Sequence, residues 1–175
     1  DFKLLGPKDT QVQSKKPVIA ITAVRTGCGK SQTSRAVANI LRKNGKKVVA
    51  IRHSMPYGKL EQETCQRFAS EKDFKRYKTT IEEEEEYQPW INNEFVVYSG
   101  FDYKKIVKAA EQEANVLIFD GGNNDLSMLK PDLLIVVVDP HRPGHELTYY
   151  PGFVNLLMAD VIIINKVDSA KKENI

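Results

Sequence analysis

The stretch Val24-Arg25-Thr26-Gly27-Cys28-Gly29-Lys30-Ser31 decides the fold of this chain. It follows the uncharged run from Val18 to Val24 (VIAITAV), which predicts a strand buried on both faces. It opens the segment from Ser31 to Lys43, whose apolar residues recur at helical spacing before a stop at Asn44-Gly45. A glycine-rich loop between a buried strand and a helix brings backbone N–H groups and the helix N-terminus to one place, where they bind anions. The stretch therefore predicts a phosphate-binding loop in an α/β domain.

In such a loop Lys30 reaches the β and γ phosphates of a nucleotide, and the hydroxyl of Ser31 binds Mg²⁺. The match to G-x-x-x-x-G-K-[ST] lacks its first glycine, because Val24 occupies that position. A glycine-rich turn of purely structural origin is the alternative. Arg25 is either a trans-acting residue, as the signature lysine is in some ATPases, or a solvated base near phosphate. The residues expected to bind the nucleotide here are Arg25, Thr26, Gly27, Cys28, Gly29, Lys30, Ser31 and Gln32.

The rest of the chain alternates short apolar runs with helical segments. Further strands are expected at Lys47 to Ile51, Phe95 to Tyr98, Val116 to Phe119, Leu133 to Val138 and Val161 to Ile164. Helices are expected at Leu60 to Ala69, at Glu71 to Tyr77, after a capping box of Thr80 and Glu83, and at Tyr103 to Ala114 with Asp102 as its cap. This alternation predicts a mainly parallel sheet flanked by helices, a P-loop NTPase architecture of the SIMIBI type, with ligands beyond the carboxyl ends of the strands.

Composition narrows the class of protein. The chain has 175 residues, 41% of them hydrophobic and 28% charged, which excludes a disordered chain, a collagen-like repeat and a disulfide scaffold. A net charge of +3 gives no argument for nucleic acid, and no run is long enough for a membrane helix. Two cysteines suit a reducing, cytoplasmic location. We expect an irregular lead-in over residues 1–16, then one nucleotide-binding domain over residues 17–175, as a piece of a longer protein that can form homo-oligomers.

Asp120 ends an apolar run, as a Mg²⁺-binding aspartate does in phosphoryl-transfer enzymes. GTPases often read D-x-x-G here, but Asn123 replaces that glycine, which argues against a glycine-triggered switch. The polar residues that follow Asp120 face either a substrate or solvent in an ordinary turn; they are Asn123, Asn124 and Asp125.

The tetrapeptide Asn165-Lys166-Val167-Asp168 follows another apolar run and fits N-K-x-D. In GTPases this motif reads guanine: the aspartate accepts hydrogen bonds from the base, and the Asn and Lys fix the loop. The alternative is a strand-to-helix turn in which Asp168 or Ser169 caps a helix. We therefore expect Asn165, Lys166 and Asp168 at a nucleotide base.

All 3 histidines lie in two loops that follow strands. We expect these loops to bind a small anionic, phosphorylated substrate and to stabilise a transferring phosphoryl group; their residues are Arg52, His53, His141, Arg142 and His145. A metal site at His141-x₃-His145 and plain loop structure remain alternatives. The run Glu82 to Glu86 is interpreted as a solvated helix face, and the neighbouring Tyr87 and Trp90 as packing residues.

Taken together, these motifs resemble the cyclic 2,3-diphosphoglycerate synthetase family over nearly the whole chain. They are Gly27 to Arg35, Arg52-His53, Met55 to Gly58, Asp120 to Asp125, Asp139 to Leu147 and Asn165 to Asp168. The resemblance implies an ATP-dependent ligase that joins the two phosphates of 2,3-bisphosphoglycerate into a cyclic anhydride. N-K-x-D suggests GTP instead, so the cofactors are ATP or GTP with Mg²⁺.

The residues expected to act in catalysis are Lys30, Asp120, Arg142, His145 and His53, with Ser31 and Asp120 at the metal. A second hypothesis is a GTPase switch of the metallochaperone or targeting type, in which the nucleotide state selects a protein partner. A third is that the chain binds nucleotide without turnover.

Overall fold

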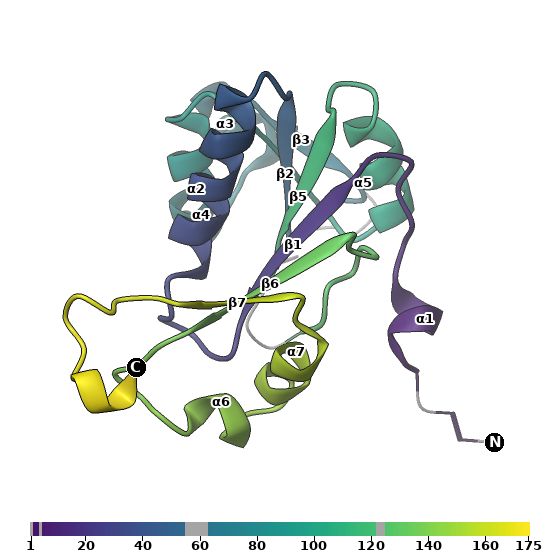
Figure 1. The fold of residues 1–175 in the computed structure, drawn as a ribbon. Helices are drawn as coiled ribbons and strands as arrows, with labels where there is room; N and C mark the ends of the chain where they lie inside the picture. Colours follow the sequence, from purple (N-terminus) through teal and green to yellow (C-terminus); the bar gives the residue numbers. More distant parts are fainter. Residues whose placement is uncertain (1, 4, 55–62, 122–124) are drawn as a thin grey trace.

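The computed structural model describes residues 2–3, 5–54, 63–121 and 125–175, and within them seven strands form one sheet (Figure 1). The strand order is β3-β4-β2-β5-β1-β6-β7. All neighbouring strands are parallel except β3, which pairs antiparallel with β4 at one edge. The bounds are β1 Val18–Ala23, β2 Val48–Arg52, β3 Gln66–Phe68, β4 Val96–Ser99, β5 Val116–Asp120, β6 Leu133–Val138 and β7 Val161–Ile164.

Helices cover both faces of this sheet, as parallel sheets require. Figure 1 shows α2 (Lys30–Lys43), α3 (Glu71–Tyr77) and α4 (Ile81–Ile91) together on one side, and α5 (Tyr103–Ala110) on the other. Three further short segments are α6 (His145–Thr148), α7 (Gly152–Met158) and a 3₁₀ turn at Lys172–Asn174. The mainly parallel α/β architecture predicted from the sequence is confirmed.

Local sequence accounts for these elements. The strand β1 (VIAITA) carries no charge and is nearly all buried, because it lies between β5 and β6 in the middle of the sheet. Thr80 caps α4 by accepting a hydrogen bond from the backbone N–H of Glu83, and Asp102 caps α5 in the same way. Tyr87 and Trp90 on the inner face of α4 are fully buried, as expected for packing residues.

One predicted helix is wrong. The segment Leu60 to Ala69 was expected to be helical, but Gln66–Phe68 forms β3, while residues 60–62 lie outside the described residues. The burial of β3 alternates: Gln66 and Phe68 are buried and Arg67 is exposed. Three residues are too few to show this period-2 pattern against a helical one, and the Phe68 ring packs 4.9 Å from the Tyr87 ring, a contact made by tertiary structure.

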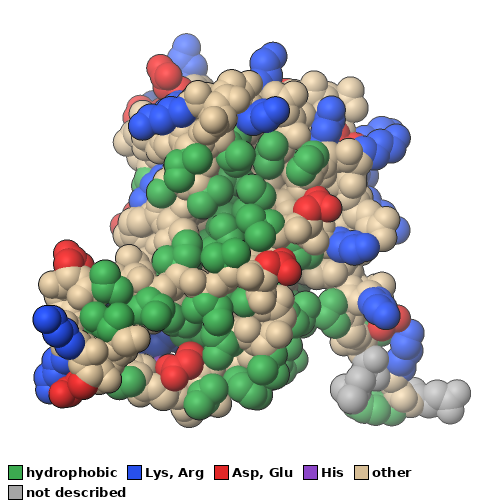
Figure 2. Space-filling model, in the orientation of Figure 1, with side chains coloured by type: hydrophobic (Ala, Val, Ile, Leu, Met, Phe, Trp, Pro, Cys, Tyr) green, Lys and Arg blue, Asp and Glu red, His purple; other side chains and the backbone are tan. Residues whose placement is uncertain are grey.

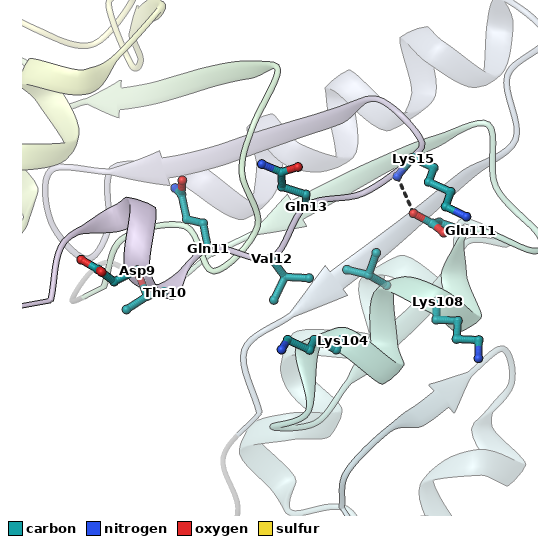
Figure 3. A pocket seen from close by; sticks show the side chains of 10 residues that line it. Asp9, Thr10, Gln11, Val12, Gln13, Lys15, Lys104, Lys108 and Glu111 are labelled. Atoms are coloured by element: carbon teal, nitrogen blue, oxygen red, sulfur yellow. Dashed lines mark hydrogen bonds between the residues drawn. The ribbon is translucent and has the colours of Figure 1, made fainter.

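The lead-in is attached to the domain rather than irregular throughout. It contains α1 (Pro7–Thr10), and Val12 pairs with Leu129 through backbone hydrogen bonds on either side. The backbone N–H of Lys15 donates to Glu111, the residue after α5, over 2.6 Å. Between the lead-in and α5 lies a hollow of about 600 Å³, lined by side chains of both, including Lys104 and Lys108 (Figure 3).

The opposite edge of the sheet, at β7, is exposed. Val161, Ile162 and Ile164 are between 42% and 51% exposed, although they lie on both faces of the strand. Phe153 and Leu157 of α7 are also exposed. Figure 2 shows hydrophobic side chains gathered on the face of the molecule in view. Across the part of the chain that the structure describes, no helix combines the length and the apolar character needed to cross a membrane.

Candidate functional site

The glycine-rich loop connects the carboxyl end of β1 to the first residue of α2, as the sequence predicts. Gly27 and Gly29 have φ angles of +88° and +98°, in the left-handed region that favours glycine. Gly29 is the residue directly before α2, a helix of 14 residues that starts at Lys30. The loop therefore ends at the N-terminus of a long helix, where the partial positive charge favours an anion.

The loop after β7 is bound directly to the glycine-rich loop. The side-chain amide of Asn165 donates to the carbonyl of Cys28 over 2.8 Å, and Lys166 Nζ donates to the carbonyl of Gly27 over 2.6 Å. A Cβ at Gly29 would overlap the Asn165 amide, so glycine is required there for space as well as for φ. Asp168, the expected base-reading carboxylate, is exposed.

Cys28 in the middle of the loop is fully buried. Burial raises the pKa of its thiol, which disfavours the reactive thiolate. Both observations support a packing role for the Cys28 side chain.

Asp120, at the carboxyl end of β5, is the centre of a buried polar cluster. Its Oδ1 accepts hydrogen bonds from Lys30 Nζ over 2.7 Å and from the Ser34 hydroxyl over 2.9 Å. Its Oδ2 accepts from Arg52, at the end of the neighbouring β2. Burial raises the pKa of Asp120, but the charges of Arg52 and Lys30 lower that pKa by more. The pKa of the carboxyl therefore lies below its usual range, and Asp120 is ionised.

Lys30 is folded back from the loop onto this carboxylate. Its side chain is only 9% exposed, and burial lowers its pKa, an effect that Asp120 partly offsets. Lys30 Nζ lies 3.5 Å from the Ser31 hydroxyl. Lys30, the residue expected to bind phosphate, therefore forms an ion pair with Asp120, the residue expected to bind metal.

The donor set around Lys30 fits Mg²⁺. Ser31 supplies a hydroxyl and Asp120 a carboxylate, both hard oxygen ligands, and Mg²⁺ typically takes few protein ligands and completes its shell with phosphate and water. Among the described residues no three His, Cys, Asp or Glu side chains come together as a metal-binding group.

Glu86 is a site residue that the sequence reasoning missed. The run Glu82 to Glu86 was interpreted as a solvated helix face, but Glu83 is buried and Glu86 forms an ion pair with Arg52. The spacing of Glu83, Tyr87 and Trp90 places them on one helix face, and Glu86 borders that face. That spacing was the available signal.

A second group of predicted residues lies on the β6–β7 side of the loop. The buried carboxylate of Asp139, directly after β6, accepts from Lys166 Nζ over 2.7 Å and lies 3.6 Å from Arg142. The Arg142 guanidinium also lies 3.6 Å from the position that a Cβ at Gly27 would take. The His141 side chain contacts a different residue: its Nε2 lies 3.0 Å from the Ser169 hydroxyl.

Arg25 and His145 are in direct contact. An Arg25 guanidinium nitrogen lies 2.6 Å from His145 Nδ1, and the Tyr149 ring lies beside both side chains. The segment with α6 and α7 also packs against the start of the loop. Gly152 lies so close to the carbonyl of Val24 that a Cβ at this position would overlap it. The loop residue Arg25 is thus positioned by this segment.

His53 lies on the other side of the loop. Its Nδ1 is 3.6 Å from Asp125 Oδ2 and 3.3 Å from the Tyr103 hydroxyl, and its side chain is 51% exposed. Because β1 separates β2 and β5 from β6 and β7, the basic residues form two groups: Arg52 and His53 on one flank, and Arg25, Arg142 and His145 on the other. Asn123 and Asn124 lie outside the described residues.

Comparison with known proteins gives a relative and a structural neighbour, and no family model matches the chain. The chain is 61% identical over all 175 residues to the protein named arginine synthetase ArcE of Thermococcus kodakarensis, and spans 39% of that protein's length. A solved structure of LpxK from Aquifex aeolicus, described as an "apo" form in complex with ATP, matches with a TM-score of 0.61. That match covers 87% of this chain and 49% of LpxK at 18% identity, a likeness of fold. The chain has an α/β, P-loop NTPase-like fold.

Proposed function

We propose that this chain is the nucleotide-binding region of a nucleotide-dependent synthetase, which uses ATP or GTP with Mg²⁺ to activate a small anionic substrate by phosphoryl transfer. The observation that carries the proposal is the contact between Lys30, at the start of α2, and the buried Asp120 at the end of β5. It brings together a lysine, which neutralises a transferring phosphoryl group, and a carboxylate, which would hold the Mg²⁺ that does the same, at the N-terminus of a helix.

The chemistry assigned to each residue follows from its place. Lys30 would bind the β and γ phosphates, and the Asp120 oxygen that it frees and the Ser31 hydroxyl would hold Mg²⁺, which would supply charge neutralisation. Phosphate is also bound by the loop residues Arg25, Thr26, Gly27, Cys28 and Gly29 and by Gln32 in the first turn of α2. The acceptor is bound by the flanking residues His53, Asp125, His141, Arg142 and His145. Arg52, also expected there from the sequence, is buried and paired with Asp120 and Glu86.

The name of the relative indicates a substrate class. A synthetase that makes arginine joins nitrogen to carbon, and phosphoryl transfer to an oxygen on that carbon creates the leaving group that the bond formation requires. The α-carboxylate of such an amino-acid substrate suits the guanidinium groups on the flanks of the loop. The cyclisation of 2,3-bisphosphoglycerate, implied by the resemblance of the motifs, uses the same donor site with a more highly charged acceptor.

A GTPase switch is the second candidate, and the contacts of Asn165 and Lys166 with the glycine-rich loop favour it. They leave Asp168 exposed, where a guanine base could be read. If Asp168 reads guanine, Asp168→Asn shifts preference from GTP towards the xanthosine nucleotide, because the amide supplies a donor in place of an acceptor.

Calorimetric titration of the chain with Mg²⁺–ATP and Mg²⁺–GTP tests the proposal. We expect binding of at least one nucleotide, and binding that is about 10- to 100-fold weaker in Lys30→Met. ATP formation from arginine, ADP and phosphate then tests the arginine reaction in reverse, with cyclic 2,3-diphosphoglycerate as the alternative substrate. Failure of both nucleotides to bind would overturn the proposal, and binding of GTP alone, with no ATP formation from either substrate, would favour the switch.

A further inference from the structure

Arg52 connects the carboxylates of Asp120 and Glu86. One terminal nitrogen of its guanidinium donates to Asp120 Oδ2, and the other pairs with Glu86 Oε2. Glu86 comes from α4, which does not otherwise belong to the predicted nucleotide site. Helix α4 thus contributes a charged side chain to the centre of the site.

Two of the three side chains in this connection are buried. The side chains of Arg52 and Asp120 are 6% and 0% exposed, whereas that of Glu86 is 34% exposed. Arg52 Nε is buried and has no hydrogen-bond partner in the described part of the chain, so the terminal nitrogens carry its ion pairs. Both carboxylates raise the pKa of Arg52 more than burial lowers it, so its charge is permanent.

A permanent charge on Arg52 affects what Asp120 can bind. With Lys30 in place, Asp120 and Glu86 balance Lys30 and Arg52. When Lys30 leaves for a phosphate, Arg52 alone would neutralise Asp120 and weaken its attraction for a divalent cation. Glu86 neutralises Arg52 instead, so that the charge of Asp120 remains available.

We propose that Glu86 is a positioning residue, which holds Arg52 on Asp120 Oδ2 and offsets its charge so that Oδ1 can exchange Lys30 for a divalent cation. The inference rests on the proposed function, since it assumes that nucleotide and cation bind at Lys30 and Asp120. It assigns a role to the glutamate run: Glu86 tunes the metal affinity of the site without touching metal or nucleotide.

The test compares Glu86→Gln with Glu85→Gln, which removes a neighbouring, exposed carboxylate from the same run. Binding of a non-hydrolysable ATP or GTP analogue is measured by calorimetry, once with Mg²⁺ and once with a chelator. We expect Glu86→Gln to weaken Mg²⁺-dependent binding about tenfold, the lower end of effects seen when an outer partner of a metal ligand is removed. Binding in chelator should change less than about twofold, and Glu85→Gln should change neither.

The double variant Arg52→Gln/Glu86→Gln separates charge from structure. If Glu86 acts by offsetting Arg52, removal of both should recover most of the Mg²⁺-dependent affinity that Glu86→Gln loses. A merely structural role predicts that the double variant binds as weakly as the single variant or more weakly. Circular dichroism confirms that each variant is folded.

The outcomes distinguish this inference from the function on which it rests. Absence of nucleotide binding by the unaltered chain would overturn both. Mg²⁺-dependent binding that is equal in Glu86→Gln and Glu85→Gln would overturn the inference alone. An equal loss with and without Mg²⁺ in Glu86→Gln, or no recovery in the double variant, would also overturn it.

Discussion

The side-chain amide of Asn165 donates to the carbonyl of Cys28 and occupies the space into which a side chain at residue 29 would project. Two loops that lie 137 residues apart in the sequence are therefore fitted to each other at this position. The fit has a direct consequence for substitution of Gly29.

Gly29→Ala is expected to destabilise the chain and to weaken nucleotide binding. Its Cβ would overlap Asn165 while its backbone stays at φ +98°, so strain and overpacking add to about 2–5 kcal/mol. Gly45→Ala is the matched control, since Gly45 has φ +73° and open space around it, and should cost about 1 kcal/mol. Urea unfolding measures both; equal costs would contradict the crowding by Asn165.

Lys166→Met is expected to lower the free energy of unfolding by about 1.5–3 kcal/mol, the value of hydrogen bonds that involve charged groups. The substitution removes the bonds to the carbonyl of Gly27 and to the carboxylate of Asp139. Lys171→Met is the control, because Lys171 is exposed and its nearest carboxylate, on Glu173, is 3.7 Å away. Denaturant titration of both variants checks the expectation, and similar values for the two would refute it.

The acid stability of the chain should depend on Asp139. Burial raises the pKa of Asp139, but its hydrogen bonds with Lys166 and with the backbone of His141 lower that pKa by more. The pKa in the folded state therefore lies below the pKa in the unfolded state. A lowered pKa contributes stability that is complete above about pH 4, the unfolded value, and is lost as the pH falls through the folded value. The free energy of unfolding, measured between pH 6 and pH 2, should therefore fall less steeply with decreasing pH in Lys166→Met than in the unaltered chain. Parallel curves for the two proteins would contradict this.

Lys30→Met should separate nucleotide binding from folding. Loss of its contacts with phosphate should weaken nucleotide binding between about 10- and 100-fold. The fold should persist, because Arg52 and Ser34 still bind Asp120. Lys43→Met, at the exposed end of α2, is the control for calorimetry and circular dichroism. Unchanged nucleotide affinity in Lys30→Met would contradict its assignment.

The sequence was sufficient for the parts of the fold that follow local rules. The strand limits at Leu133–Val138 and Val161–Ile164 and the caps Thr80 and Asp102 follow from apolar runs and side-chain capping alone. The strand β3 did not, since Phe68 is buried by Tyr87, a residue 19 positions later in the chain. Short-range patterns hold no information about that contact.

The candidate site shows the same division. The loop residues Gly27, Gly29 and Lys30 were predicted from spacing, because backbone geometry dictates them. The partition of basic residues into two flanks depends on strand order, which places β1 between them and which spacing does not reveal. The pairing of Glu86 with Arg52 depends on how α4 packs against the sheet, so a run of five glutamates could not show which member faces inward.

Within the described residues β7 has a neighbouring strand on one side only, and this edge affects how the 175-residue chain behaves in solution. Val161, Ile162 and Ile164 form an exposed, β-branched strand edge, and such edges are templates for pairing between molecules. We expect the chain to aggregate as its concentration rises, independently of nucleotide. Ile162→Lys should raise the concentration at which the chain aggregates, because a charge on an edge strand opposes intermolecular β-pairing.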